Sequence, residues 1–507
     1  MVATPHDGAT HAGAAILRRG GTAIEALIAA GAALAVLYPH FCGLGGDAVW
    51  IVSDIRGTSR CFLAIGQATE AADSLSRLPL RGPGSVVTSA CLVDSWEHLL
   101  GFSTGHWGGT ERLGPLLEPA IGLAQEGFPV SASQRYWHDF RKDGSDAWPG
   151  FHPLFRREGV QRQPDLARSL RLIADQGARS FYEGELASRI IAGLAATGAP
   201  LTARDLARTR TREADPIRQD YRGLTLLAPP PPTQGATTLA IMGILQHLPM
   251  ADFPLGSSGY YHRLVEAVKL AFLDRDLIAD PDRGGDPTQH LLDPARLAAK
   301  ARRIDPGCAL PWPQPFRTGD TAMLAAVDGR GNCAALLQSL YFDWGSGVVA
   351  GDTGILWQNR GAAFSLDPAS PNRIAAGKRP FYTLNPGLAL RNGQPHLLYG
   401  TQGADGQPQT LALLLSLLAD HGLSPEAALV QPRFLLGRTF SDPNDSLKIE
   451  GGLRRAEMDG LAALGHAVVP IDALSQLGGQ AAILRVDADG CIKGAHDPRS
   501  DGGAEAA

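Results

Sequence analysis

Apolar residues recur at helical spacing along several stretches of the chain, and this pattern predicts where its helices lie. Residues 11–37 show it clearly, and the glycine pair at positions 20 and 21 interrupts it, so we expect a helical hairpin there. The other helices are expected over residues 92–100, 117–129, 164–196, 236–248, 260–278 and 410–418, and residues 280–287 are expected to form a loop.

Two apolar runs, residues 323–327 and 333–341, have the composition of buried strands. The sequence Asp-Gly-Arg-Gly-Asn between them has the chemistry of a tight turn, so the two runs predict a β-hairpin. Further strands are expected over residues 48–53, 397–400 and 481–486. Strands joined as hairpins, without regular strand-helix-strand alternation, favour an α/β fold in which antiparallel sheets pack face to face beneath helices.

The composition indicates a large globular protein. With 507 residues, of which 44% are hydrophobic, the chain can bury a core of several layers. The net charge of −5 and the lack of a run rich in lysine and arginine disfavour nucleic acid as a partner. The cysteines lack the paired spacing of zinc sites, and we interpret them as reduced core residues, with no metal expected. They are Cys42, Cys61, Cys91, Cys308, Cys333 and Cys491.

No segment predicts a membrane anchor. The most apolar run, residues 26–37, is shorter than the ~20 residues that span a bilayer. The first residues, Met-Val-Ala-Thr-Pro-His, lack the charged and apolar regions of a secretory signal. We therefore expect a cytoplasmic protein, although export of a longer precursor stays open.

Two segments rich in glycine or proline could bind ligands, but their context favours structural roles. The glycines within residues 41–47 precede a strand, whereas a phosphate-binding loop follows a strand and opens a helix. We therefore expect a tight buried turn and no nucleotide cofactor. The prolines within residues 226–235 halt sheet pairing before the next helix, and the alternative is a ligand for a proline-binding module.

Thr321 lies at the entrance to the predicted hairpin, directly after Asp320. If the Asp320–Thr321 peptide bond were cut, Thr321 would carry a hydroxyl and a free α-amine, so nucleophile and base would belong to one residue. An α-amine titrates near pH ~8 and is partly neutral at neutral pH, so it can accept the hydroxyl proton. The proline-rich residues 306–320 have the composition of an exposed linker. On the local pattern alone, a threonine that merely opens a strand is the more common case.

The segments around Thr321 resemble, in order and spacing, the nucleophile region of the γ-glutamyltransferase (γ-glutamyltranspeptidase) family. They are Gly319-Asp-Thr321, Val327-Asp-Gly-Arg-Gly-Asn332, Gln338-Ser-Leu340, Phe342-Asp-Trp-Gly-Ser-Gly-Val-Val349 and Thr353-Gly-Ile-Leu356. The resemblance extends from residues 1–6 to residues 431–434 and beyond. It implies the four-layer αββα sandwich of N-terminal-nucleophile hydrolases and a precursor that cleaves itself before Thr321. Residues 1–320 and 321–507 would then be the two subunits of one intertwined domain.

The family mechanism implies roles for four residues. The Thr321 hydroxyl attacks an amide carbonyl, its α-amine relays the proton, and water or an acceptor amine releases the acyl group. In the family two consecutive glycine N–H groups stabilise the oxyanion, and Gly403 and Ala404 occupy these positions. A backbone N–H survives a change from glycine to alanine if the backbone angle φ stays allowed. Ser339 falls where the family has a hydroxyl close to the amine of the nucleophile, although it could also be an ordinary strand serine.

The expected substrate pocket departs from the family pattern. The arginine that binds the α-carboxylate of a γ-glutamyl group is replaced by Gln67, and the acid that binds its α-amino group is replaced by Ala363. Tyr382 and Thr383 stand in place of two serines. The bidentate ion pair of the family is thus lost, and a glutathione-type substrate should bind more weakly.

Tyr341 and two arginines complete the expected substrate site. Tyr341 ends the second strand of the predicted hairpin, close to the nucleophile in the sequence pattern. Arg360 or Arg379 could supply the missing cation, and each could equally be a solvated surface residue.

The resemblance implies an amidohydrolase or acyltransferase that acts on a γ-glutamyl or related acyl amide, with water or an amine as acceptor. One alternative is an amidase for a small amide that is not γ-glutamyl, as in the oxamate amidohydrolase and cephalosporin acylase branches. The other is a catalytically silent relative that only binds. Asp320, Thr321 and Gly403 favour the enzyme, because a silent protein has no need of them. Neither a membrane nor nucleic acid is expected as a partner.

Overall fold

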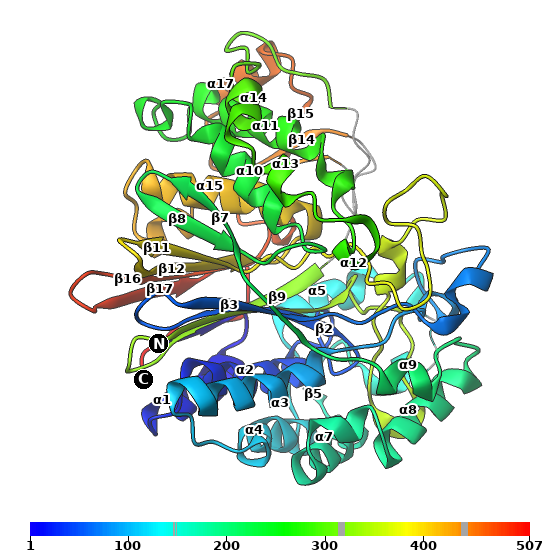
Figure 1. Cartoon of the computed structure of the whole chain (residues 1–507). Helices are drawn as coiled ribbons and strands as arrows, with labels where there is room; N and C mark the ends of the chain where they lie inside the picture. Colours follow the sequence, from blue (N-terminus) through cyan, green and yellow to red (C-terminus); the bar gives the residue numbers. More distant parts are fainter. Residues whose placement is uncertain (146–147, 149, 313–319, 438–444) are drawn as a thin grey trace.

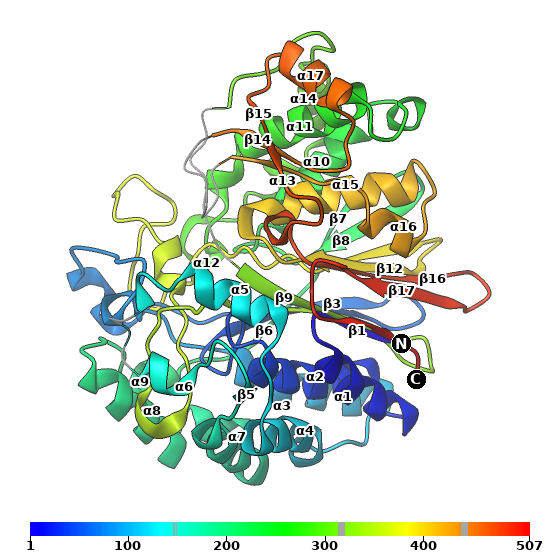
Figure 2. The same cartoon turned by 180° about the vertical axis from the view of Figure 1, so that it is seen from behind.

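The computed structural model describes residues 1–145, 148, 150–312, 320–437 and 445–507. Two antiparallel sheets lie face to face in the middle of the molecule, and helices cover the outer face of each (Figure 1). These four layers confirm the expected αββα sandwich. The two chain ends lie close together, because β1 (Val2–Thr4) pairs with β18 (Gly503–Glu505) (Figure 2).

The first sheet has the strand order β18-β1-β9-β10-β2-β3-β6. Its remaining strands are β9 (Asp320–Val327), β10 (Cys333–Tyr341), β2 (Asp47–Ser53), β3 (Ser59–Ala64) and β6 (Arg212–Ala214). Strands β9 and β10 are the hairpin expected from the sequence. Because β1 lies between β18 and β9, the beginning, middle and end of the chain share one sheet.

The second sheet has the strand order β17-β16-β12-β11-β8-β7. The strands are β17 (Ile492–His496), β16 (Ala481–Val486), β12 (Gln394–Thr401), β11 (Gly387–Arg391), β8 (Leu224–Ala228) and β7 (Ile217–Tyr221). Apolar side chains of both sheets form one buried cluster between them, which includes Val49, Ile51, Leu337, Leu388, Leu398 and Leu484. Side chains alternate between the two faces of a strand, so each sheet also offers an apolar face to helices.

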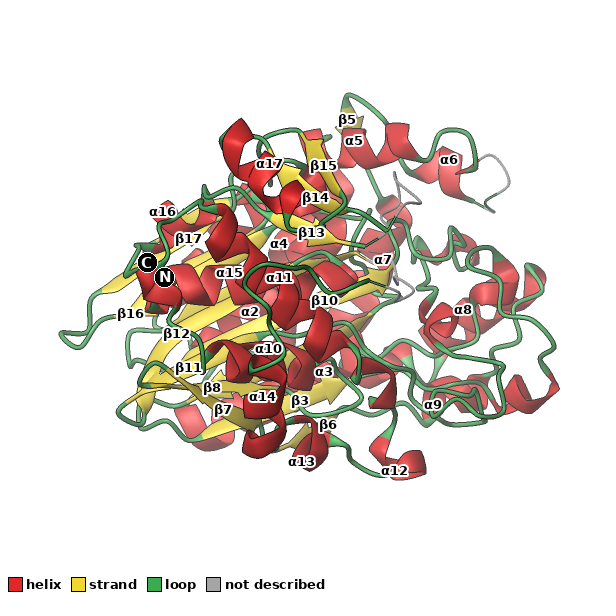
Figure 3. Ribbon diagram, turned by 90° about the horizontal axis from the view of Figure 1, so that it is seen from above, coloured by secondary structure: helices red, strands yellow, loops and turns green. Residues whose placement is uncertain are grey.

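Two layers of helices cover these outer faces. Over the first sheet lie α1 (Asp7–Arg18), α2 (Ala23–Leu37), α3 (Leu92–Phe102), α4 (Leu113–Glu126), α7 (Pro164–Gln176) and α8 (Glu185–Ala196). Over the second sheet lie α10 (Gly235–Leu245), α11 (Ser258–Phe272), α14 (Pro294–Ala301) and α15 (Gln407–Ala419), as the view from above shows (Figure 3).

Shorter elements surround this frame. The helices are α5 (Ala132–Phe140), α6 (Phe151–Leu154), α9 (Ala203–Ala207), α12 (Pro281–Gly284), α13 (Thr288–Leu291), α16 (Pro425–Leu429) and α17 (Arg455–Ala463). The strands β13 (Phe434–Leu436), β14 (Leu447–Glu450) and β15 (Val468–Ile471) form a small sheet, and β4 (Phe128–Pro129) pairs with β5 (Val160–Gln161).

The expected helical hairpin consists of α1 and α2. Thr22 begins α2 with a capping box, in which its hydroxyl accepts from the Glu25 N–H and the Glu25 carboxylate accepts from the Thr22 N–H at 2.7 Å. Every residue of α2 is buried, so the alanine-rich run forms the centre of its layer. No helix within the described ranges is long and apolar enough to cross a membrane.

Two expected helices and one expected loop differ from the structure. The helix expected over residues 164–196 is divided into α7 and α8, because Gly177 and Gly184 between them adopt positive φ angles. The helix expected over residues 260–278 ends as α11 at Phe272. The loop expected over residues 280–287 contains the short helix α12.

The cysteine prediction is wrong at two positions. Cys308 and Cys491 are exposed, whereas the other four thiols are buried and all six are free. Both exposed cysteines lie in segments of polar and turn-forming residues. The prediction failed because it followed the general preference of cysteine for the core and did not use this local pattern.

Candidate active site

Thr321 is the second residue of β9, an inner strand between β1 and β10. Its side chain is fully buried, and its Oγ1 has no hydrogen-bond partner among the described residues. The linker expected before it is exposed or half-buried over residues 306–312, and residues 313–319 lie outside the described residues. A buried hydroxyl without a partner is costly to the fold, and this marks Thr321 as a functional candidate.

Ser339 holds the carbonyl group of the peptide bond that precedes Thr321. Its Oγ donates a hydrogen bond to the Asp320 carbonyl oxygen and accepts one of 2.7 Å from the Tyr341 N–H. The pairing of β9 with β10 is regular as far as Gln338 and then shifts, so that Tyr341 lies opposite Asp320. Tyr341 has a φ of +82°, a value that residues other than glycine rarely adopt. A strained bulge thus directs a hydroxyl donor at one carbonyl.

The Asp320 side chain is buried close to a second carboxylate. Its Oδ1 accepts a hydrogen bond from Gln402 Nε2. Burial, reinforced by the Asp343 carboxylate, raises the pKa of Asp320 well above its usual range. Asp343 itself is held by Arg81 and Arg141, whose Nη2 atoms lie 2.9 Å and 2.7 Å from its Oδ1. The protonated form of Asp320 is therefore favoured beside the Asp320–Thr321 bond.

Gly403 and Ala404 form a turn directly after β12. Gln234 anchors this turn, because its Nε2 donates to the carbonyl oxygens of Ala404 at 2.8 Å and of Thr383 at 2.7 Å. Neither the Gly403 nor the Ala404 N–H donates to another residue that the structure describes. Ala404 has a φ of +45°, a left-handed conformation that costs an alanine ~1–2 kcal/mol. Two unused N–H donors in one anchored turn suit an oxyanion.

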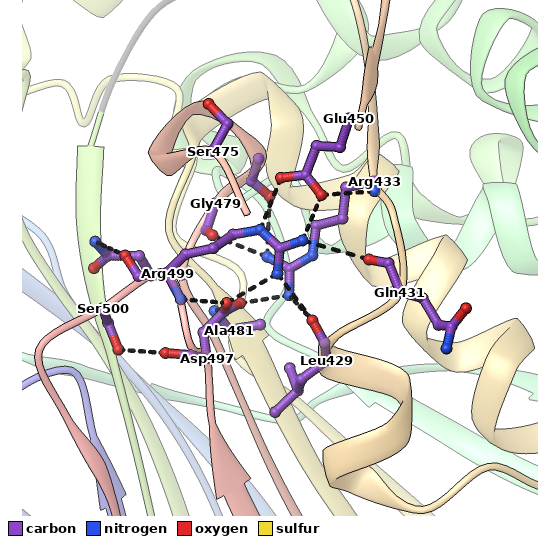
Figure 4. Close-up of polar contacts among 12 residues, drawn as sticks. Leu429, Gln431, Arg433, Glu450, Ser475, Gly479, Ala481, Asp497, Arg499 and Ser500 are labelled. Carbon is purple, nitrogen blue, oxygen red and sulfur yellow. Dashed lines mark hydrogen bonds and ion pairs between the residues drawn. The ribbon is translucent and has the colours of Figure 1, made fainter. Parts of the chain in front are cut away.

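Arg433, Glu450, Asp497 and Arg499 form a buried network of charges (Figure 4). The Arg433 guanidinium pairs with Asp497 and donates a hydrogen bond of 2.9 Å to the Gly479 carbonyl oxygen. Arg499 pairs with the same Asp497 at 3.0 Å. A β-carbon added to Gly403 would lie 3.8 Å from the Gly479 Cα. The network therefore fixes the backbone at Gly479, which lies against the turn formed by Gly403 and Ala404.

Arg360 is buried between two tyrosine rings. Its guanidinium carbon lies 3.9 Å from the ring centroid of Tyr341 and 3.9 Å from that of Tyr382. Its Nη1 donates a hydrogen bond of 3.3 Å to Thr383 Oγ1, whereas Nε and Nη2 have no partner among the described residues. Burial lowers the pKa of Arg360 to about 10, so the group stays charged at neutral pH. The alternative of a solvated surface arginine is wrong.

Asp47 supports this arrangement from the first sheet. Its Oδ2 accepts a hydrogen bond from the Tyr382 hydroxyl, and its Oδ1 accepts from the N–H groups of Gly66 at 3.0 Å and Cys91 at 2.7 Å. Burial raises the pKa of Asp47 to about 7. Gln67, the next residue after Gly66, is half-buried and its N–H donates to a serine hydroxyl. The glycine-rich residues before Asp47 form the buried turn expected from the sequence.

Two other sequence candidates do not offer a charge to a substrate. Arg379 is buried, but its Nη2 lies 2.5 Å from Asp280 Oδ1, so a surface position is wrong and its charge is already paired. Ala363 is buried against Tyr341 and Phe342. Where the family has an acid, this chain therefore has an apolar contact.

One group of side chains has the composition of a metal site. Potential ligand atoms of His262 and Glu266, both in α11, and of His466 lie within 4.8 Å of one another. The His262 Nδ1 and His466 Nε2 atoms already form a hydrogen bond of 2.8 Å, and the Lys269 ammonium lies 2.7 Å from Glu266 Oε1. Each of these three side chains therefore already has a partner within the protein.

The structure links Ser339, Tyr341, Arg360, Tyr382 and Thr383 into one series of contacts that begins at Asp320. Sequence reasoning missed the residues that support the series, which are Asp47, Gln234, Asp343, Gln402 and Arg433. Each adjoins or lies within a segment that attracted attention for its glycines, its prolines or its family pattern. For Asp47 and Asp343 the available signal was a carboxylate among glycine and apolar residues.

Known proteins resemble the chain over its whole length. The family profile described as gamma-glutamyltranspeptidase matches residues 9–507. The oxamate amidohydrolase proenzyme of Klebsiella pneumoniae is 41% identical over 517 residues, covering 99% of this chain and 98% of that protein. A glutathione hydrolase-like proenzyme of Bacillus subtilis is 39% identical over 520 residues, with the same shares covered. The crystal structure of a cephalosporin acylase from Bacillus halodurans has a TM-score of 0.89 at 32% identity, covering 100% of this chain and 95% of that chain.

These similarities span both sides of the Asp320–Thr321 bond, and the shared fold agrees with the αββα sandwich described above. The chain therefore belongs to the γ-glutamyltranspeptidase family of N-terminal-nucleophile hydrolases.

Proposed function

We propose that the chain cleaves itself between Asp320 and Thr321 and then hydrolyses a small acyl amide through an acyl-enzyme on Thr321. The observation that carries this proposal is the hydrogen bond from Ser339 Oγ to the Asp320 carbonyl oxygen, beside a buried Thr321 hydroxyl that has no partner among the described residues. A donor on that oxygen stabilises the negative charge that develops when a nucleophile attacks the carbonyl carbon.

Self-cleavage proceeds as an acyl shift from nitrogen to oxygen. Thr321 Oγ attacks the Asp320 carbonyl carbon, and its proton passes to the departing amide nitrogen, which becomes the α-amine of Thr321. The resulting ester is hydrolysed by water, which leaves a carboxylate on Asp320 and returns the hydroxyl. Two subunits result, residues 1–320 and 321–507, and they stay associated because β1, β9 and β10 share one sheet.

The same hydroxyl then serves the substrate. The new α-amine accepts the proton of Thr321 Oγ as the oxygen attacks the substrate amide, and the N–H groups of Gly403 and Ala404 stabilise the oxyanion. The amine of the substrate leaves with the transferred proton, and water hydrolyses the acyl-enzyme. An amine acceptor in place of water would give acyl transfer.

The pocket favours an acyl group other than γ-glutamyl. Gln67 and Ala363 provide neither the cation nor the anion that would pair with the charged head of a γ-glutamyl group. The similarity to proteins named oxamate amidohydrolase and cephalosporin acylase supports an amidase for a small amide of another kind. Glutathione remains the second candidate, supported by the glutathione hydrolase-like relative.

The purified protein and two variants test this function. Wild type should give two bands on a denaturing gel, and the smaller chain should begin Thr-Ala-Met-Leu. Thr321→Ala should stay one chain and release no ammonia from amides, while Thr321→Ser, which keeps a hydroxyl, should still cleave. An intact wild-type chain that hydrolyses amides would contradict the α-amine mechanism.

A further inference from the structure

We propose that Arg360 binds a carboxylate on the acyl part of the substrate, directly adjacent to the amide carbonyl that Thr321 attacks. This proposal rests on the proposed function and names its substrate class, a short amide whose acyl group is an anion. Its basis is a buried cation with an unused binding edge.

The guanidinium of Arg360 lacks the partner that its burial demands. The residue has no exposed surface, and Nε and Nη2 make no hydrogen bond to any described residue. These two nitrogens share the edge of the guanidinium that binds a carboxylate through two parallel hydrogen bonds. A charge removed from water without such a partner is strongly unfavourable, so a ligand that supplies an anion satisfies an existing need.

Protein groups already contact the other sides of the guanidinium. Tyr341 and Tyr382 cover the two faces of the guanidinium at 3.9 Å each, and Thr383 Oγ1 accepts from Nη1. The nearby Asp47 carboxylate already accepts three hydrogen bonds, one of them from the Tyr382 hydroxyl. The cation is therefore held in place before a ligand arrives, which lowers the entropic cost of binding.

Contacts also connect Arg360 to both parts of the proposed reaction centre. Tyr341, on which it stacks, is the cross-strand partner of Asp320. Thr383, which it contacts, shares the Gln234 side chain with Ala404. On this proposal, a carboxylate bound to Arg360 lies close to the carbonyl under attack, so the acyl group must be short. The α-carboxylate of a γ-glutamyl group is several bonds further away and carries an ammonium group beside it, for which the site has no anion at Ala363.

Oxamate and oxamide form a matched pair that isolates the charge. They have the same shape, but oxamate has a carboxylate where oxamide has a second, neutral amide. After correction for the two equivalent amides of oxamide, wild type should show a kcat/KM for oxamate on the order of 10²-fold higher, as expected when a charge-paired contact is lost. Ammonia release measures both reactions. Malonamate and succinamate, which insert one and two methylenes, should be progressively poorer substrates.

Variants at position 360 assign the preference to this residue. Arg360→Gln should bring the ratio of the two kcat/KM values close to one, and Arg360→Lys should give an intermediate ratio because lysine is a point charge without the planar fork. Self-cleavage to two chains shows that each variant folds and that Thr321 is reactive.

The outcomes separate the two proposals. If wild type cleaves itself but hydrolyses oxamate no better than oxamide, the carboxylate site is wrong while self-cleavage stands. If Arg360→Gln lowers both rates equally, Arg360 has a structural role only. If wild type does not cleave itself and is inactive, the proposed function fails and this proposal fails with it.

Discussion

The hydroxyl of Ser339 donates a hydrogen bond to the carbonyl oxygen of Asp320 across the β9–β10 pair. Regular pairing ends at Gln338, and one additional residue on β10 then brings Tyr341 opposite Asp320. The extra residue allows the serine side chain to reach back to the facing backbone. A local departure from sheet geometry thus places a donor on the peptide bond before Thr321.

Replacement of Ser339 by alanine should slow self-cleavage. Loss of one donor to a developing oxyanion costs ~3 kcal/mol, which corresponds to roughly a 10²-fold lower rate. Ser339→Thr retains the hydroxyl and should cleave at a rate close to that of wild type. The rate is measured from the conversion of one band to two after synthesis of the unprocessed chain. Equal rates for wild type and Ser339→Ala would show that this hydrogen bond only positions β10.

Replacement of Ala404 by glycine should stabilise the protein without loss of activity. Glycine would relieve the ~1–2 kcal/mol that the left-handed φ of +45° costs alanine. The greater entropy of an unfolded chain with glycine would offset ~0.4–1 kcal/mol of this stabilisation. The net increase in the free energy of unfolding should be about 0.5–1 kcal/mol in urea denaturation. The backbone N–H is unchanged, so kcat for an amide should be unchanged. Gly403→Ala, at a φ of +120°, is the control and should destabilise.

The sequence was sufficient for the frame of the molecule because that frame follows from local patterns. Apolar runs with turn residues between them predict β9 and β10, and the glycine pair predicts the break between α1 and α2. The position of Thr321 at the entrance to the hairpin follows in the same way. A repeated pattern over several residues specifies each of these features.

The environment of Arg360 could not be predicted, because it depends on single residues far apart in the chain. The hydrogen bond from Tyr382 to Asp47 joins positions separated by 335 residues. Arg360 is buried by the rings of Tyr341, at the end of a strand, and Tyr382, in a separate loop. No periodic sequence pattern predicts that these residues come together. A charged side chain at position 360 is equally compatible with a surface residue and with a binding site, and only the folded structure distinguishes the two.

Asp47 should make stability depend on pH. Its pKa is raised from 3.8 to about 7, so the folded protein binds this proton more tightly than the unfolded chain. Stability from this group is fully present below pH ~4 and is lost as pH rises toward ~7, by up to ~4 kcal/mol. Asp47→Asn does not titrate and should therefore flatten the profile of unfolding free energy between these limits. Urea denaturation of both proteins across this range measures the difference, and parallel profiles would show that Asp47 does not titrate in this window.

The network in Figure 4 should be important for both stability and activity. Arg433→Met removes one partner of the buried Asp497, and breaking a buried ion pair typically costs about 3–5 kcal/mol of unfolding free energy. The loss should be smaller than this because Asp497 keeps its pair with Arg499. The substitution also removes the donor to Gly479, so kcat should fall more than KM rises. Arg454→Met is the matched control, because the Arg454 side chain is largely exposed and its pair with Glu457 should contribute less than ~1 kcal/mol. Similar effects of the two substitutions on unfolding and kcat would remove any special role for the network.

The charged anchors of the family should be transferable to this pocket. Wild type should hydrolyse glutathione poorly, with a kcat/KM below ~10⁴ M⁻¹s⁻¹, because Gln67 and Ala363 leave the ends of the γ-glutamyl head unpaired. Gln67→Arg combined with Ala363→Asp should raise kcat/KM for a γ-glutamyl anilide. The new carboxylate at position 363 packs beside Tyr341, on which Arg360 stacks, so it should also compete for the cation and lower activity on oxamate. The two single variants serve as controls, since each supplies one charge only. Efficient hydrolysis of glutathione by wild type would mean that other residues bind the glutamate head, and the argument from the pocket would fail.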